Sequence, residues 1–292
     1  MCKCAEHIRP IRLQIMEDSD IRNTLARAGF TFKKQYGQNF LTDKTVLDSI
    51  VGLSDAAGSC VVEIGCGAGT LTRALAAKAA FVHAYEIDKT LQPVLARTLA
   101  GLDNVDVTFK DFLKLRLDLL EKELPEYRVV ANLPYYITTP LIMMLLEHSQ
   151  KCLSLTVMVQ REVAERLCAR PNTPQYGAIT ANMALYASCR KVLDVGREKF
   201  YPVPNVDSAV VRIDICRGRL GAVDEKTYRR TVQAAFSARR KTLENNLCRA
   251  FSLTRAQAQT VLSQCGVPAG ARGETLSPED FVRLSAALSD SI

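Results

Sequence analysis

Residues 60–69 of this chain read CVVEIGCGAG, and the fold follows from this stretch. Its first part, 60–64, is a short apolar run that contains one acid, Glu63, and such a run is typical of a buried strand. Glycines follow at 65, 67 and 69. Because glycine has no Cβ, glycines at alternate positions let the backbone turn sharply and come close to a ligand. The stretch therefore predicts a strand, a glycine turn and a helix, in that order.

The chain beyond this turn continues to alternate between strands and helices. We expect helices at 71–80, 91–100 and 140–147 and strands at 82–87, 105–109, 127–131 and 155–159. This alternation is typical of a mostly parallel sheet with helices on both faces, an α/β fold. A proline-rich loop, and not a helix, separates 191–195 from 207–215, so we expect these two segments to form an antiparallel pair at the sheet edge.

The length of 292 residues fits about two domains at roughly 150 residues per domain. We assign 1–30 to an N-terminal extension with a short helix and 31–221 to the α/β domain. After Gly221 the β-branched runs vanish and the apolar pattern becomes helical, so 222–292 is expected to be a small all-helical domain. Residues 217–292 hold 12 Lys and Arg against 7 Asp and Glu, which favours contact with a polyanion, although a solvated surface gives the same count.

Composition excludes several classes of protein. Apolar residues are 48% of the chain and charged residues 24%, which excludes a disordered or collagen-like chain. The longest apolar runs are far shorter than the ~20 residues of a membrane span, and no signal peptide is recognisable, so we expect a cytoplasmic protein. The ten cysteines include no C-x-x-C pair and are expected to be reduced thiols. Cys2, Cys4 and His7 lack a fourth ligand nearby, so no metal site is expected.

Acidic residues follow the next two predicted strands. Glu86 stands 21 residues after Gly65, and an acid at this distance can accept hydrogen bonds from the hydroxyls of a ribose. Asp111 follows the strand at 105–109 and could accept from an adenine amino group, or it could simply cap a helix. Since ligands of an open α/β sheet bind beyond the carboxyl ends of the strands, these residues predict a nucleoside-bearing cofactor.

The spacing of the glycines bears on which cofactor this is. The pattern is G-x-G-x-G instead of G-x-G-x-x-G, and Glu63 precedes it. A dinucleotide pyrophosphate requires bare N–H groups without a nearby anion, whereas S-adenosylmethionine, with its ammonium and sulfonium groups, tolerates an acidic rim. The pattern favours S-adenosylmethionine over NAD, and a glycine turn that serves packing alone is the remaining alternative.

The turn at Asn132, Leu133, Pro134 and Tyr135 directly follows the strand at 127–131. An exocyclic amine that attacks a methyl group needs acceptors for its N–H bonds. Asn132 offers its amide oxygen, and Leu133 or Pro134 a backbone carbonyl in a turn that proline makes rigid. Tyr135 could stack on a base. Ordinary turn chemistry with Tyr135 in the core is the alternative interpretation.

With these motifs in place, the chain resembles the KsgA-type ribosomal-RNA adenine N6,N6-dimethyltransferases from about Phe32 to Leu288. The resemblance rests on the stretches QNFL (38–41), EIGCGAG (63–69), YEID (85–88), NLPY (132–135), FYPVPNVDSAVV (200–211) and RRKTL (239–243). One departure from the family pattern is Cys66, which stands where many relatives have proline. The resemblance implies a class I methyltransferase domain, Rossmann-like, with a helical C-terminal domain, acting on two adjacent adenosines in a hairpin loop of the small-subunit rRNA.

The resemblance also implies roles for single residues. Five of them would bind S-adenosylmethionine: Asn39 and Leu41 close over it, Gly65 contacts its methionine end, Glu86 holds its ribose and Asp111 its adenine. Asn132 would lie where cofactor and target adenine meet, and Phe200 would stack on that adenine opposite Tyr135, unless Phe200 is only a loop residue folded under the sheet edge.

The basic residues Arg239, Arg240 and Lys241 are predicted to contact phosphates of the rRNA, in an immature 30S-type particle and with the protein as a monomer. Three other functions stay open from the sequence. The relatives that methylate large-subunit rRNA share the cofactor motifs, although their fourth-strand motif usually has Ile or Val in place of Leu133. A ribosome-assembly factor with secondary methylation and a DNA adenine methyltransferase are the others.

Overall fold

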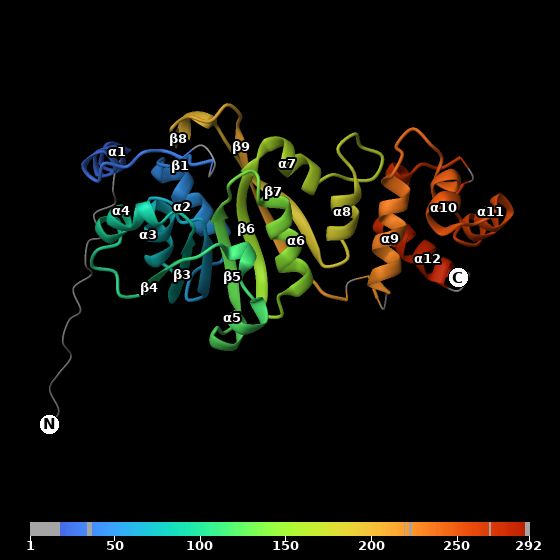
Figure 1. Ribbon diagram of the computed structural model, residues 1–292, viewed down its shortest axis with the longest axis horizontal. Helices are drawn as coiled ribbons and strands as arrows, with labels where there is room; N and C mark the ends of the chain where they lie inside the picture. Colours follow the sequence, from blue (N-terminus) through green and yellow to red (C-terminus); the bar gives the residue numbers. More distant parts are fainter. Residues whose placement is uncertain (1–17, 34–36, 219, 222–223, 269, 290–292) are drawn as a thin grey trace, which may run out of the picture.

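The computed structural model describes residues 18–33, 37–218, 220–221, 224–268 and 270–289 (Figure 1). The candidate ligands Cys2, Cys4 and His7 lie outside the described residues. Within the described ranges, no three His, Cys, Asp or Glu side chains are grouped as a metal site would require. This part of the chain also contains no helix with the length and apolar character of a membrane span.

A seven-stranded sheet forms the centre of the molecule, with the order β4-β3-β2-β5-β6-β9-β7. Its strands are β2 (Cys60–Ile64), β3 (Phe81–Glu86), β4 (Val105–Phe109), β5 (Tyr127–Asn132), β6 (Cys152–Gln160), β7 (Ala187–Val195) and β9 (Ser208–Ile215). The first five are parallel, and β9 runs antiparallel to both β6 and β7. The structure thus confirms the predicted parallel sheet with an antiparallel pair at one edge.

Helices cover both faces of this sheet (Figure 1). One core lies between the sheet and α2 and α3, and a second core lies between the sheet and α6, α7 and α8. The helices that follow β1 (Phe40–Leu41) in the α/β part are α2 (Lys44–Leu53), α3 (Thr70–Ala76), α4 (Gln92–Thr98), α5 (Leu117–Glu123), α6 (Thr138–His148), α7 (Arg161–Leu167) and α8 (Ala178–Met183). The apolar pattern did not predict α5, α7 and α8, which are only six or seven residues long and show a helical period weakly.

Helix α1 (Asp18–Arg27) and strand β1 pack with the glycine turn and α4 in a third apolar core. Helix α1 confirms the short helix expected in the extension. The two-residue strands β1 (Phe40–Leu41) and β8 (Phe200–Tyr201) pair antiparallel and form a second, small sheet. Neither strand was predicted, because a two-residue strand exists only through its partner.

The C-terminal region is helical, as predicted. It consists of α9 (Glu225–Phe236), α10 (Leu243–Phe251), α11 (Arg255–Gln264) and α12 (Pro278–Ser289). Tyr228 and Phe281 are fully buried between α9 and α12, and the Tyr228 hydroxyl donates to the carbonyl oxygen of Ala181 in α8 at 2.8 Å. The tail helices and α8 share one continuous apolar core. This shared core fixes the tail helices against the α/β part.

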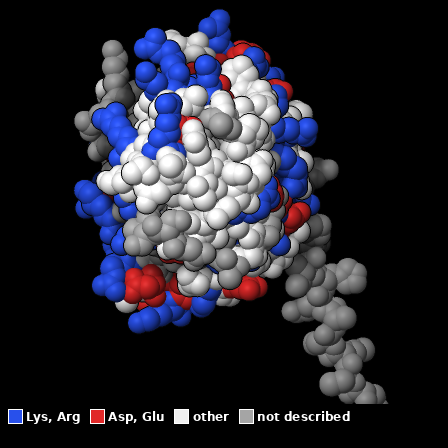
Figure 2. Space-filling view, turned by 90° about the vertical axis from the view of Figure 1, so that its right-hand side faces the viewer, with Lys and Arg blue, Asp and Glu red and all other residues white. Residues whose placement is uncertain are grey.

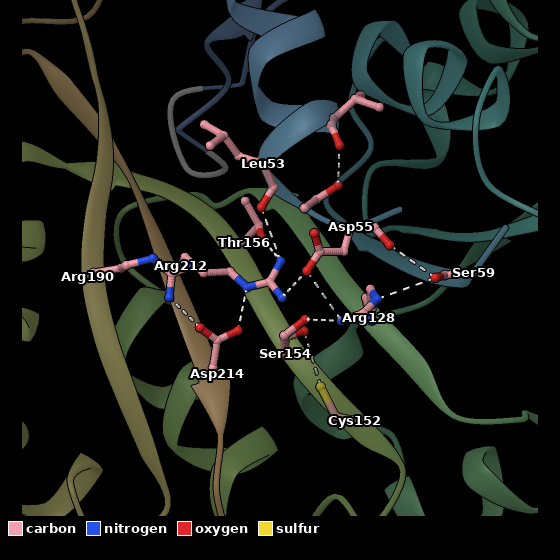
Figure 3. Close-up of polar contacts among 12 residues, drawn as sticks. Leu53, Asp55, Ser59, Arg128, Cys152, Ser154, Thr156, Arg190, Arg212 and Asp214 are labelled. Atoms are coloured by element: carbon pink, nitrogen blue, oxygen red, sulfur yellow. Dashed lines mark hydrogen bonds and ion pairs between the residues drawn. The ribbon is translucent and has the colours of Figure 1, made fainter. Parts of the chain in front are cut away.

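A buried arginine holds the end of α2 against the sheet (Figure 3). The guanidinium of Arg212 in β9 lies between two carboxylates, with Nε 2.7 Å from Asp214 and Nη2 2.8 Å from Asp55, and it also donates to the carbonyl oxygen of Leu53. Although burial alone would raise the pKa of Asp214, the hydrogen bonds from Arg212 and Arg190 lower it. A buried charge is tolerated only when it is paired in this way. The network is structural and lies away from the glycine turn.

Candidate active site

The glycine turn after β2 has a separate physical reason for each of its glycines. Gly65, Gly67 and Gly69 all have positive φ, at 76°, 54° and 83°. Gly67 is also the most confined, because a Cβ there would lie 2.8 Å from Cε1 of Phe40. Gly69 is the N-cap of α3. The turn therefore needs both the left-handed backbone and the missing side chain.

Glu86 ends β3 and closes this turn from the side. Its Oε2 accepts the Gly67 N–H at 2.8 Å, and its Oε1 accepts the N–H groups of Ile87 and Asp88 at 2.9 and 2.8 Å. The side chain is 6% exposed. Burial raises the pKa of Glu86 despite the three N–H donors, which act to lower it. These donors orient the carboxylate at the carboxyl end of β3.

Glu63 does not form the acidic rim expected from the sequence. Its carboxyl is buried beneath the turn, and burial raises its pKa to about 8, so the group is mainly neutral at pH 7. It is also absent from the wall of the neighbouring cavity. Because strand β2 turns this side chain into the interior, Glu63 does not provide the charge that was expected to repel a pyrophosphate.

A cavity of about 220 Å³ lies at the carboxyl ends of β2, β3, β4 and β5. It brings together most of the residues predicted for the site. The wall is formed by residues 37–40, Ile64, Gly65, Gly67, 85–87, Leu91, 110–113, 132–137 and Phe200. Of the predicted cofactor residues, only Leu41 is missing from this wall. Leu41 is 2% exposed and packs in the core beside α2, where its carbonyl oxygen accepts from Thr70 Oγ1 at 2.8 Å.

Asp111 serves two purposes at once. Its Oδ1 accepts the Leu113 N–H at 3.1 Å and so caps the short 3-10 helix Phe112–Lys114. Its side chain is 28% exposed, and it lines the cavity. The structure confirms the helix cap, one of the two interpretations offered from the sequence, and binding of an adenine amine by Asp111 stays a prediction.

The turn from Asn132 to Tyr135 forms another part of the cavity wall. Asn132 Nδ2 donates to the carbonyl oxygen of Asn39 at 3.1 Å, which leaves Oδ1 as the acceptor of that side chain. The Pro134 carbonyl already accepts from Ile137 N at 3.1 Å and Thr138 Oγ1 at 3.3 Å, at the start of α6. Of the two backbone carbonyls proposed for an amine, the geometry therefore favours that of Leu133.

The two aromatic residues of the predicted clamp both reach the cavity. The Tyr135 hydroxyl lies 3.2 Å from Oγ of Ser208, the first residue of β9. Phe200 is only 2% exposed, because β8 pairs with β1 in the register Leu41 with Phe200. Phe200 thus packs against the sheet edge, as the alternative interpretation held, and also lines the cavity wall. Stacking on a base stays a prediction.

Asp88 is a site residue to which the sequence pattern assigned no role of its own. It is 2% exposed and accepts from Lys33 Nζ at 2.6 Å and from Gln38 Nε2 at 2.8 Å. Burial raises the pKa of Asp88, but the hydrogen bonds from Lys33, Thr90 and Gln38 outweigh this and lower it. Asp88 therefore anchors residues 37–41, the crossing segment, which lies against the glycine turn at Phe40. The position of Asp88 two residues after Glu86 was the one feature of the sequence that could have indicated a role near the cavity.

The three basic residues of the tail lie in the loop between α9 and α10, and they differ in role. Arg239 Nη2 donates to the carbonyl oxygens of Pro174 and Tyr176, both at 3.0 Å. Arg239 therefore joins the tail to the loop before α8. Arg240 and Lys241 are exposed. The phosphate-binding role predicted for these three residues stays a prediction. Because Arg239 has internal partners, Arg240 and Lys241 are the stronger candidates for it.

Charge is unevenly distributed over the helical end of the molecule (Figure 2). The middle of this face carries few charged residues, and Lys and Arg gather toward its margins. The exposed residues of α11 after Arg255 are uncharged, namely Ala256, Gln257, Gln259, Thr260, Ser263 and Gln264. The basic surplus of the tail is thus not spread over the face formed by α11.

The glycine turn, the acids after β3 and β4 and the Asn132 turn together define a class I methyltransferase fold with a helical C-terminal region. The profile of the ribosomal RNA adenine dimethylase family matches residues 29–290. The chain belongs to this family.

Individual relatives agree over nearly the full length. The chain is 43% identical over 285 residues to the ribosomal RNA small subunit methyltransferase A of Streptococcus equi subsp. zooepidemicus, covering 94% of this chain and 98% of that protein. The protein of the same name from Geobacillus thermodenitrificans is 43% identical over 276 residues, covering 91% and 94%.

Solved structures give a consistent result. A dimethyladenosine transferase from Plasmodium falciparum superimposes with a TM-score of 0.72 at 27% identity, covering 84% of this chain and 95% of that one. The 23S rRNA methyltransferase ErmE superimposes with a TM-score of 0.68 at 30% identity, covering 86% and 100%.

Proposed function

We propose that the protein uses S-adenosylmethionine to dimethylate the N6 amines of two adjacent adenosines in a hairpin loop of small-subunit rRNA. Its substrate is an immature 30S-type particle in the cytoplasm, and it acts as a monomer. The observation that carries the proposal is the cavity itself, in which Glu86 and Asp111 stand near the Asn132 turn. The small-subunit methyltransferases named above support the choice of rRNA.

The wall of the cavity fits the cofactor. Glu86 presents an oriented carboxylate to the ribose hydroxyls, Asp111 lies on the next strand for the adenine amine, and Gly65 leaves space at the turn for the methionine end. Asn39 lies on the crossing segment, held through Asn132. When bound, S-adenosylmethionine supplies an electrophilic methyl group on its sulfonium.

The reaction needs positioning more than acid–base chemistry. Asn132 Oδ1 and the Leu133 carbonyl accept the two N–H bonds of the adenine amine, so its lone pair is freed from ring conjugation and directed at the methyl group. These acceptors also stabilise the positive charge that develops on N6. The proton leaves after the transfer, so no strong general base is required. Tyr135, fixed through Ser208, stacks on the base.

Arg240 and Lys241 hold the rRNA by its phosphates, which adds affinity without sequence preference. Specificity for adenine comes from the cavity. A large-subunit target is the second candidate, because ErmE is matched over 100% of its chain.

The test is to incubate the purified protein with methyl-labelled S-adenosylmethionine and small ribosomal subunits that lack the modification, with large-subunit RNA offered in parallel. The digested RNA is then searched for the labelled nucleoside. We expect N6,N6-dimethyladenosine in the small-subunit RNA. Label confined to large-subunit RNA would transfer the protein to the second candidate, and no label in either would favour an assembly factor.

A further inference from the structure

Two thiols face each other where α7 meets the edge strand β7. The Sγ atoms of Cys168 and Cys189 lie 3.4 Å apart. Cys168 is the C-cap of α7, Cys189 lies within β7, and both side chains are partly buried. Because the two residues are 21 positions apart in the sequence, only tertiary packing brings them together.

We propose that Cys168 and Cys189 form a dithiol that a hydroperoxide oxidises to an intramolecular disulfide. The sulfur atoms of a disulfide are about 2.0 Å apart, so the pair must approach by roughly 1.4 Å. Rotation about the side-chain bonds can supply much of this movement. Cys168 also stands just beyond the last helical residue of α7, where no further turn of helix confines it.

The environment makes Cys168 the nucleophile. The hydrogen bond from the Cys189 thiol lowers the pKa of Cys168, burial opposes this, and the charge of Lys191 lowers it further. The same contact raises the pKa of Cys189, as does its burial, so Cys189 keeps its proton. A thiolate beside a second thiol is the arrangement in which oxidation is resolved as a disulfide.

The chemistry balances with the hydroperoxide as the sole oxidant. The Cys168 thiolate attacks one peroxide oxygen, the O–O bond breaks, and the leaving hydroxide takes up a proton to become water, or an alcohol from an organic hydroperoxide. Cys168 is then a sulfenic acid. The Cys189 sulfur attacks the Cys168 sulfur, the S–O bond breaks, and the hydroxide leaves with the Cys189 proton as a second water. Two thiols are oxidised and one peroxide is reduced.

Other cysteines provide a contrast. Cys66 and Cys152 are buried, and burial raises the pKa of both thiols, so they are poor nucleophiles. Cys216 is exposed and reports on unselective oxidation.

The disulfide would tie the sheet edge to the segment 168–177. This segment contacts the tail through Asn172, whose N–H donates to the Glu274 carbonyl at 2.9 Å, and through the two carbonyls that accept from Arg239. Oxidation would therefore restrain the segment that connects the α/β part with the Arg239 loop. A crosslink over about 20 residues should raise the unfolding temperature by roughly 5 °C.

The experiment treats the full-length protein with hydrogen peroxide, blocks the remaining thiols with N-ethylmaleimide and maps the peptides without reduction. Mapping is needed because Cys2 and Cys4 are close in sequence and could also react. We expect a Cys168–Cys189 linked peptide, an unfolding temperature raised by roughly 5 °C, and loss of both on reduction. In Cys189→Ser, a cyclic 1,3-dione should trap a sulfenic acid on Cys168.

Cys248→Ser is the matched control, because Cys248 is a partly buried thiol in α10 and should not affect the crosslink. The proposal is overturned if Cys216 is oxidised while Cys168 and Cys189 still react with N-ethylmaleimide. It is also overturned if oxidation of the parent protein stops at a sulfinic acid on Cys168. Misfolding of Cys189→Ser would not affect the test, because the linked peptide is sought in the parent protein.

Discussion

Replacing Gly67 by alanine should destabilise the protein and weaken cofactor binding together. The new Cβ would lie 2.8 Å from Cε1 and 2.9 Å from Cδ1 of Phe40, closer than packed atoms tolerate. Phe40 packs against the rings of Phe30 and Phe32, with centroids 6.0 and 5.7 Å away, so it cannot move alone. The segment that crosses the glycine turn would have to shift with it.

The magnitude has two parts. A left-handed backbone costs a non-glycine residue about 1–2 kcal/mol, and φ at Gly67 is 54°. Forcing an additional methyl group into a packed site costs about 1–3 kcal/mol more. The free energy of unfolding should therefore fall by about 2–5 kcal/mol. If about 1.4 kcal/mol of this cost is borne by the cofactor site, the Kd for S-adenosylmethionine rises about tenfold.

Gly101 offers a matched control. Its φ is 80°, but a Cβ there would meet nothing within 4 Å. Gly101→Ala should therefore lower the free energy of unfolding only by the backbone part, about 1–2 kcal/mol. Its Kd for S-adenosylmethionine should not change. Urea unfolding and calorimetric titration with S-adenosylmethionine measure both quantities. Equal losses of stability in the two variants would refute the idea that Phe40 requires glycine at 67.

Three further predictions concern the site and the tail. Asn132→Ala should lose most turnover and retain cofactor binding in calorimetry, and near-normal turnover would contradict the assigned role. Arg240→Ala and Lys241→Ala should each flatten the log–log salt dependence of rRNA binding by up to about one unit. Arg239→Ala should instead keep this slope. It should lose about 1 kcal/mol of the free energy of unfolding in urea, because its internal hydrogen bonds are lost. The folded state lowers the pKa of Asp88. The contribution of Asp88 to stability is therefore complete above its unfolded pKa of about 4 and disappears as the pH falls below its folded pKa. Asp88→Asn should reduce the loss of unfolding free energy between neutral pH and pH 3, and parallel acid profiles of the two proteins would count against this.

Local sequence was sufficient for the features that depend on the backbone itself. The turn at 65–69 was predictable because only glycine adopts these φ values without strain. The acids after β3 and β4 were predictable because the carboxyl ends of parallel strands meet at one edge. Together with the NLPY turn, they located the cavity and indicated a methyltransferase.

Which atoms each side chain uses was decided by partners far away in the sequence. Leu41 is in the core because β1 pairs with β8, 159 residues later at Phe200, and that same pairing buries Phe200. Arg239 donates to Pro174 and Tyr176, residues on another element, so a basic run in the sequence did not reveal its internal role.

The sequence alone therefore determined the parallel sheet and the edge at which the cavity lies, because strand periodicity and glycine spacing are encoded within a few residues of each feature. Its short motifs carried the resemblance to the family. Tertiary structure alone decided that Glu63 is buried and neutral, that Asp88 anchors the crossing segment and that the Pro134 carbonyl is already used. Burial and hydrogen-bond partnership are properties of the surroundings, and the surroundings of a residue are assembled from segments that the local sequence does not specify.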